Sequence, residues 1–170
     1  GHNGLDFGGG FPFGTPVYPA LHGLEGTVVL VEKNDFKTRG YGVQVLEKID
    51  DKRSIGTIYW HFGEIFVTAG QVVTKGTALG TMGNSGFVMP PKTPECPTCG
   101  THVHFGVYEV ENGTTPQNEY RGYKDPVPYV FIPGEKLDIA FYRDLFFGKS
   151  GNDVSWLQTI LKLEGFAEDY

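Results

Sequence analysis

Two histidines that alternate along one apolar segment are the residues of this chain best suited to carry chemistry. His102 and His104 lie in the segment 100–110, where valine, phenylalanine and tyrosine favour a β-strand. Because successive strand residues point to opposite faces, both imidazoles share one face, roughly 6–7 Å apart. Two imidazoles at that distance either bind one metal ion together, or one binds the ion while the other moves protons beside it. The alternative is a pair of half-buried structural histidines.

A second candidate pair, His2 and Asp6, stands near the start of the sequence. On a flat strand, residues four positions apart lie about 13 Å from each other, which is too far to share an ion. Gly4 lies between them and permits the bulge or turn that would bring them together. Taken alone, this spacing is common and arises by chance more often than as a metal site.

The chain has five histidines, and four of them can join Asp6 in a single site. A zinc hydrolase needs three protein ligands, an open position for water, and nearby groups that move protons and stabilise an oxyanion. His2, Asp6 and one member of the His102 and His104 pair provide such a ligand set. The imidazole of His61 and that of the other member of the pair would then face the substrate.

Short strands separated by glycine-rich turns are expected to position these residues. His61 falls near the end of one expected strand, whereas His22 lies in a turn-rich segment and is interpreted as a surface histidine. The expected strands are residues 15–20 at a sheet edge, 26–32, 40–47 and 55–62, followed by a compact unit over 67–73 and 77–82. This spacing predicts a mainly β fold, an antiparallel sandwich or open barrel.

One helix is expected near the C-terminus. Asp153 is a suitable N-cap, and an apolar stripe at helical spacing follows it before Gly165, formed by Val154, Leu157, Ile160 and Leu161.

Composition excludes several classes of protein. The 170 residues are 39% hydrophobic and 20% charged, with 25 glycines and 11 prolines, which fits a turn-rich globular domain rather than a coiled coil or a disordered tail. A net charge of −6 argues against nucleic acid or an anionic membrane as the main partner. No apolar run approaches the roughly 18–20 residues of a membrane helix. Cys96 and Cys99 supply only half of a four-ligand structural zinc site, so they form either a local disulfide or a reduced pair.

Several short motifs follow one another in a specific order. They are H-N-G-L-D-F, G-T-P-V-Y-P-A, G-Y-G-V-Q-V, Y-W-H-F, V-T-A-G-Q-V-V-T-K-G-T-A-L-G-T-M-G-N-S-G, T-H-V-H-F-G-V and D-P-V-P-Y-V. Over about residues 2–131 this order resembles the lysostaphin/LytM-type zinc endopeptidases of peptidoglycan. The resemblance implies that His2, Asp6 and His104 bind zinc and that His61 and His102 are the catalytic pair. None of the five is replaced, which disfavours a non-catalytic relative.

The chain also departs from that family. Family members usually pass from the S-G turn to the H-x-H strand within a few residues, but here residues 87–99 are inserted, and Thr101 stands where a proline is common. The insertion borders the expected cleft, so substrate preference cannot be copied from a relative. Cys96 and Cys99 are hypothesised to staple this loop.

The tail suggests a second, incomplete unit. Residues 145–161 are similar to the opening of a helical peptidoglycan-binding module, of which only the first helix would be present. The expected division is therefore an endopeptidase domain over 1–131, followed by a linker and partial peptidoglycan-binding-like segment over 132–170.

The resemblance implies a secreted or otherwise extracytoplasmic, bacterial or phage-derived monomer that uses Zn2+ to hydrolyse peptide bonds in peptidoglycan stems or cross-bridges. Nucleic-acid binding and membrane insertion are not expected. Two alternatives remain. One is a non-catalytic wall-binding domain with a structural zinc. The other is a biotinyl- or lipoyl-like carrier that would use Lys75 in a tight hairpin.

Overall fold

The computed structural model describes residues 4–8, 10–34, 38–115, 122–126 and 129. Their strands are β1 (Leu5–Gly8), β2 (Pro16–Val17), β3 (Glu25–Lys33), β4 (Tyr41–Lys48), β5 (Arg53–Trp60), β6 (Phe62–Ile65), β7 (Val72–Thr74), β8 (Gly80–Met82), β9 (His102–Glu111) and β10 (Tyr123–Lys124). All pairings between these strands are antiparallel, so the predicted mainly β fold is confirmed. His2, the C-terminal helix and the segment 132–170 lie outside the described residues.

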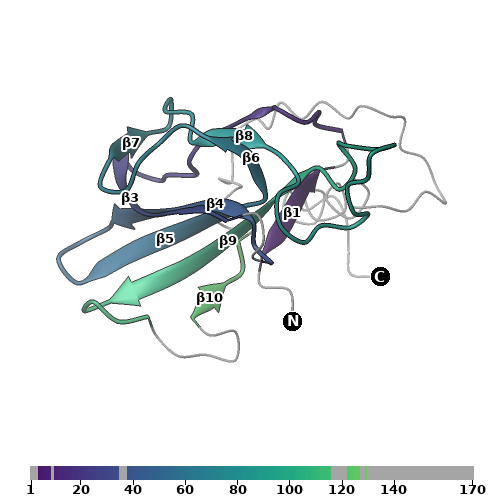
Figure 1. Ribbon diagram of the computed structural model, residues 1–170. Coiled ribbons are helices and arrows are strands. Elements are labelled where there is room, and N and C mark those ends of the chain that lie inside the picture. Colours follow the sequence, from purple (N-terminus) through teal and green to yellow (C-terminus); the bar gives the residue numbers. More distant parts are fainter. Residues whose placement is uncertain (1–3, 9, 35–37, 116–121, 127–128, 130–170) are drawn as a thin grey trace, which may run out of the picture.

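The strands form two sheets. The larger has the order β1-β9-β5-β4-β3-β7, with β10 also paired to β9, and the smaller has the order β2-β8-β6. Figure 1 shows the smaller sheet lying over one face of the larger one, with β1 alongside β9. The described strands thus make an open two-layer arrangement rather than a closed barrel.

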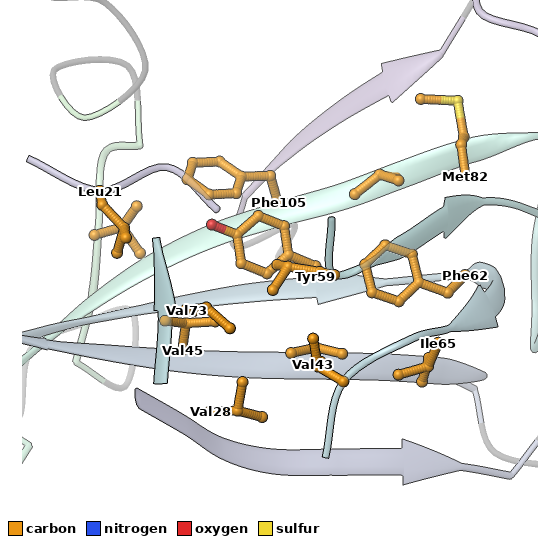
Figure 2. Packing of buried hydrophobic residues seen from close by; sticks show 14 residues of the cluster. Leu21, Val28, Val43, Val45, Tyr59, Phe62, Ile65, Val73, Met82 and Phe105 are labelled. Atoms are coloured by element: carbon orange, nitrogen blue, oxygen red, sulfur yellow. The ribbon is translucent and has the colours of Figure 1, made fainter. Parts of the chain in front are cut away.

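The core fills the space between the two layers. Alternate residues of β4, β5 and β9 point into it and meet side chains from the smaller sheet, including Phe62 and Met82. Figure 2 shows the rings of Tyr59, Phe62 and Phe105 among aliphatic side chains of this cluster. Burying each large apolar side chain contributes about 1.5–3 kcal/mol, so this layer supplies most of the stabilisation available to the sheets.

The unit predicted over residues 67–73 and 77–82 is divided between the sheets. β7 pairs with β3 in the larger sheet, whereas β8 pairs with β2 and β6 in the smaller one. β7 and β8 therefore do not pair as the tight hairpin that a carrier domain would need around Lys75. Within the described residues no helix is long and apolar enough to cross a membrane.

Candidate active site

Strand β9 brings the candidate residues together because it lies between β1 and β5. In the antiparallel register Asp6 pairs with His104 on one side of β9, and Trp60 pairs with His104 on the other. Val103 and Phe105 are buried in the core, so the alternation of β9 turns His102 and His104 to the opposite face of the large sheet. Residues nearly one hundred positions apart thus meet through strand pairing alone.

Asp6 and His104 place two atoms that can act as metal ligands next to each other. The Oδ1 atom of Asp6 lies 3.0 Å from the Nδ1 atom of His104, and both side chains are partly exposed. Two ligand atoms that bind a tetrahedral zinc ion at about 2.0–2.1 Å are roughly 3.3 Å apart. The oxygen and nitrogen atoms present, and their separation, therefore fit two positions around one zinc ion.

The third predicted ligand is His2, which lies outside the described residues. Within the described part of the chain, no group of three histidine, cysteine, aspartate or glutamate side chains is arranged to hold a metal ion. The described pair of donors therefore needs a further ligand to complete a zinc site.

A backbone carbonyl holds the ring of His102 through the ring nitrogen that points away from Asp6. Its Nδ1 atom lies 2.7 Å from the carbonyl oxygen of Gly100, so Nδ1–H donates there and Nε2 remains on the side of Asp6. The Nε2 atom is 3.9 Å from Asp6 Oδ1, and the His102 backbone N–H donates to Gly83 at 3.0 Å. This arrangement fixes the tautomer and directs Nε2 into the site.

His61 is oriented in the same way but from another element. The sequence predicted His61 near the end of a strand over 55–62, but β5 ends at Trp60 and His61 adopts a left-handed backbone conformation with φ 67°. Its Nδ1 atom lies 2.8 Å from the carbonyl oxygen of Ser85, which leaves Nε2 free. The rings of His61 and His102 have centroids 4.6 Å apart, and that of His104 is 6.5 Å from His61.

The Ser85 carbonyl can approach His61 only because Gly40 has no side chain. Gly40 has φ +62°, and a Cβ atom there would overlap the Ser85 carbonyl group. The Ser85 hydroxyl in turn accepts the backbone N–H of Tyr41 at 2.8 Å. The 84–86 turn is thereby fixed against the start of β4.

The environment of His61 favours the neutral imidazole. Partial burial lowers the pKa of His61, and the hydrogen bond to the Ser85 carbonyl and the charge of Asp6 offset only part of that effect. His102 and His104 lower the pKa further. With Nδ1 protonated toward Ser85, the neutral ring presents a lone pair on Nε2.

These side chains open into a cavity of about 530 Å3. The cavity is lined by Asp6, His61, His102 and His104 together with residues 87–90 and 100–101 of the loop between β8 and β9. A cavity of this size accommodates a short peptide segment beside the imidazoles.

The model of peptidase family M23 matches residues 1–118 of the sequence, which is more than half of the chain. The chain belongs to peptidase family M23. A curated relative, the peptidoglycan DD-endopeptidase ShyA of Vibrio cholerae, is 37% identical over 90 residues, covering 53% of this chain and 18% of that protein. The chain therefore spans less than two thirds of the curated relative it matches.

Solved M23 structures share the fold. The catalytic domain of the antimicrobial peptidase lysostaphin from Staphylococcus simulans aligns with TM-score 0.51 and 21% identity, covering 76% of this chain and 78% of that one. The catalytic domain of the prophage-encoded M23 protein EnpA from Enterococcus faecalis, crystallised as a mutant, aligns with TM-score 0.50 and 22% identity, covering 74% and 76%.

The sequence did not reveal the groups that orient the imidazoles in this M23 domain. The carbonyl groups of Ser85 and Gly100 act through the backbone, so their residue types carry little signal. The N-S-G motif and Gly100 do mark tight turns beside the site. Arg39 was also missed. Its carbonyl accepts the His61 backbone N–H at 3.3 Å, and its guanidinium lies 5.4 Å from the centre of the Trp60 ring.

Proposed function

We propose that the chain is a zinc-dependent endopeptidase that hydrolyses peptide bonds in peptidoglycan stems or cross-bridges. The observation that carries this proposal is the meeting of Asp6, His61, His102 and His104 at one cavity of an M23 fold. The activity named for the relative ShyA supports peptidoglycan as the substrate.

His2, Asp6 and His104 are proposed to hold the zinc ion. Asp6 and His104 already present an oxygen and a nitrogen 3.0 Å apart on paired strands. When bound by these residues, zinc supplies Lewis acidity toward the scissile carbonyl and toward water.

His61 and His102 are proposed to handle protons and charge. Each ring is anchored through Nδ1 to a backbone carbonyl, so each can offer Nε2 to the reacting groups. One Nε2 accepts a proton from the attacking water as the new C–O bond forms, and a protonated Nε2 stabilises the negative oxygen of the tetrahedral intermediate. When the C–N bond breaks, the proton passes to the leaving amine.

The proposed site of action is outside the cytoplasm, where peptidoglycan lies. The disulfide between Cys96 and Cys99 supports this location, because disulfides persist mainly in oxidising compartments.

Digestion of purified cell wall tests the proposal. The zinc-loaded chain should release new amino termini, a chelator should stop the release, and added zinc should restore it. His22→Ala is a matched control, because His22 does not line the cavity, and it should retain activity. A protein that binds zinc and cell wall but releases no amino termini would instead support the non-catalytic wall-binding alternative.

A further inference from the structure

The loop between β8 and β9 contributes an apolar wall to the cavity that the imidazoles line. This cleft wall consists of residues 87–90, which line the same cavity as His61 and His102. Phe87 and Met89 are 67% and 69% exposed, whereas Val88 between them is 4% exposed. The wall therefore anchors one side chain inside the protein and leaves its two large neighbours accessible to solvent.

The cleft wall is attached to the rest of the domain at several points. The backbone N–H of Phe87 donates to the Thr38 carbonyl at 3.0 Å. Val88 packs against Gly100, where a Cβ atom would lie 2.6 Å from its Cγ2 atom. These contacts hold the wall in place before substrate arrives, which lowers the entropic cost of using it for binding.

The remainder of the loop is also fixed. The buried side-chain amide of Asn84 donates to the carbonyl oxygens of Pro97 at 2.8 Å and of Cys99 at 2.9 Å. The disulfide between Cys96 and Cys99 closes a short turn in the loop shortly before β9 begins. Exposed apolar side chains on a fixed wall beside a reactive centre indicate a contact surface for substrate.

The chemistry of the wall selects the kind of substrate residue it can recognise. The side chains of Phe87 and Met89 present only carbon and sulfur atoms. They can make van der Waals contact with an apolar side chain of the substrate, but a substrate residue without a side chain offers no such contact. An alanine of the substrate beside the wall would offer it a methyl group, and a glycine in the same place would offer none. One methyl or methylene group in an apolar site changes kcat/KM by about tenfold.

We infer that Phe87 and Met89 determine specificity by contacting the side chain next to the scissile bond, so that alanine-flanked bonds are cleaved in preference to glycine-flanked bonds. This inference rests on the proposed endopeptidase function. It assigns to the inserted loop a role in substrate choice that is separate from zinc binding and proton transfer.

Matched synthetic peptides test this specificity. Two cross-linked stem peptides would carry either alanine or glycine at both positions flanking the scissile bond, and kcat/KM would be measured for each. The wild-type chain should prefer the alanine peptide by about tenfold. The double variant F87S/M89S should lose about tenfold on the alanine peptide, with less than about a twofold change on the glycine peptide.

A control variant and a digestion of whole peptidoglycan by the wild-type chain separate the possible failures. Phe66→Ser removes another exposed phenylalanine that does not line the cavity, and it should leave both values unchanged. If the wild-type chain digests peptidoglycan but cleaves both peptides equally, the specificity inference alone is overturned. An equal loss of kcat/KM on both peptides in a folded, zinc-loaded double variant would also overturn it. A wild-type chain that digests no peptidoglycan would overturn the proposed function and this inference with it.

Discussion

Gly4 lies so close to His104 that a Cβ atom at Gly4 would be 2.8 Å from the His104 Nε2 atom and would overlap the carbonyl oxygen of Phe105. The glycine between His2 and Asp6 is therefore required by the close approach of the chain to β9. A bend in the chain is only part of its role. One partner in this contact is the proposed zinc ligand His104, and the other lies in the segment that joins the proposed ligands His2 and Asp6.

Gly4→Ala should disturb that site. Because the Phe105 backbone cannot move easily, β1 would have to shift away from β9 and carry Asp6 with it. We expect zinc affinity to fall by about 10–100-fold, as for changes beside metal ligands, and stability to fall by about 1–3 kcal/mol. Zinc content after dialysis and denaturant unfolding measure the two effects. Gly76→Ala is the control, because a Cβ atom there meets only Thr74 Oγ1 at 4.0 Å; equal zinc content in the two variants would contradict the prediction.

Replacing the two histidines of β9 should give different defects. His104→Ala removes a proposed ligand, so the purified protein should contain no zinc. His102→Ala should keep its zinc and lose turnover by about 10²-fold or more, because its proposed role is in proton transfer. Metal analysis and release of amino termini from cell wall separate the two defects. A His102→Ala protein without zinc would refute this division of roles.

The disulfide in the loop between β8 and β9 can be tested directly. Cys96 and Cys99 are the only cysteines and they are bonded, so a thiol assay should count none before reduction and two afterwards. A short closed loop of this kind stabilises by roughly 1–2 kcal/mol in the chain-entropy account. Reductant should therefore lower the melting temperature of the wild type by a few degrees and leave that of C96S/C99S unchanged. Two thiols without reductant, with an unchanged melting temperature, would contradict the hypothesis.

The sequence was sufficient to predict β9 and the shared face of its histidines, because strict alternation of polar and apolar residues determines which face each side chain occupies. It could not show that Asp6 pairs with His104, since strand order and register depend on tertiary packing. The backbone of His61 was also unpredictable. The run Y-W-H-F has strand-forming composition throughout, and only the packing of Gly40, Ser85 and Arg39 reveals the left-handed residue within it.

Buried polar residues were missed for a related reason. Glu47 lies on a strand whose alternation looks ordinary, but the residue is only 4% exposed and its carboxylate accepts the backbone N–H groups of His22 and Gly23. His22 was correctly placed at the surface, but its backbone is tied to this carboxylate from a distant strand. Such partners are 24 or 25 residues apart and have no local signature.

A buried tyrosine should make the fold sensitive to alkaline pH. The hydroxyl of Tyr59 donates to Thr57 Oγ1 at 3.1 Å and accepts the Ala20 N–H at 2.8 Å. Burial raises the pKa of Tyr59 to about 12, because the phenolate would lose its hydration there. Since the folded pKa lies above the unfolded value of about 10, this group's stabilising contribution is complete below pH 10 and declines as pH rises toward 12. The decline amounts to roughly 2–3 kcal/mol.

Tyr59→Phe separates this ionisation from the rest of the fold. At pH 8 the variant should be less stable by about 1–3 kcal/mol, because Ala20 and Thr57 lose their buried partner. The free energies of unfolding of the variant and the wild type should converge between pH 10 and 12, since only the wild type must keep Tyr59 protonated. Urea unfolding at several pH values measures both curves. Tyr18→Phe, at a tyrosine that is 50% exposed, should follow the wild type throughout, and a pH-independent gap between Tyr59→Phe and the wild type would contradict the assignment.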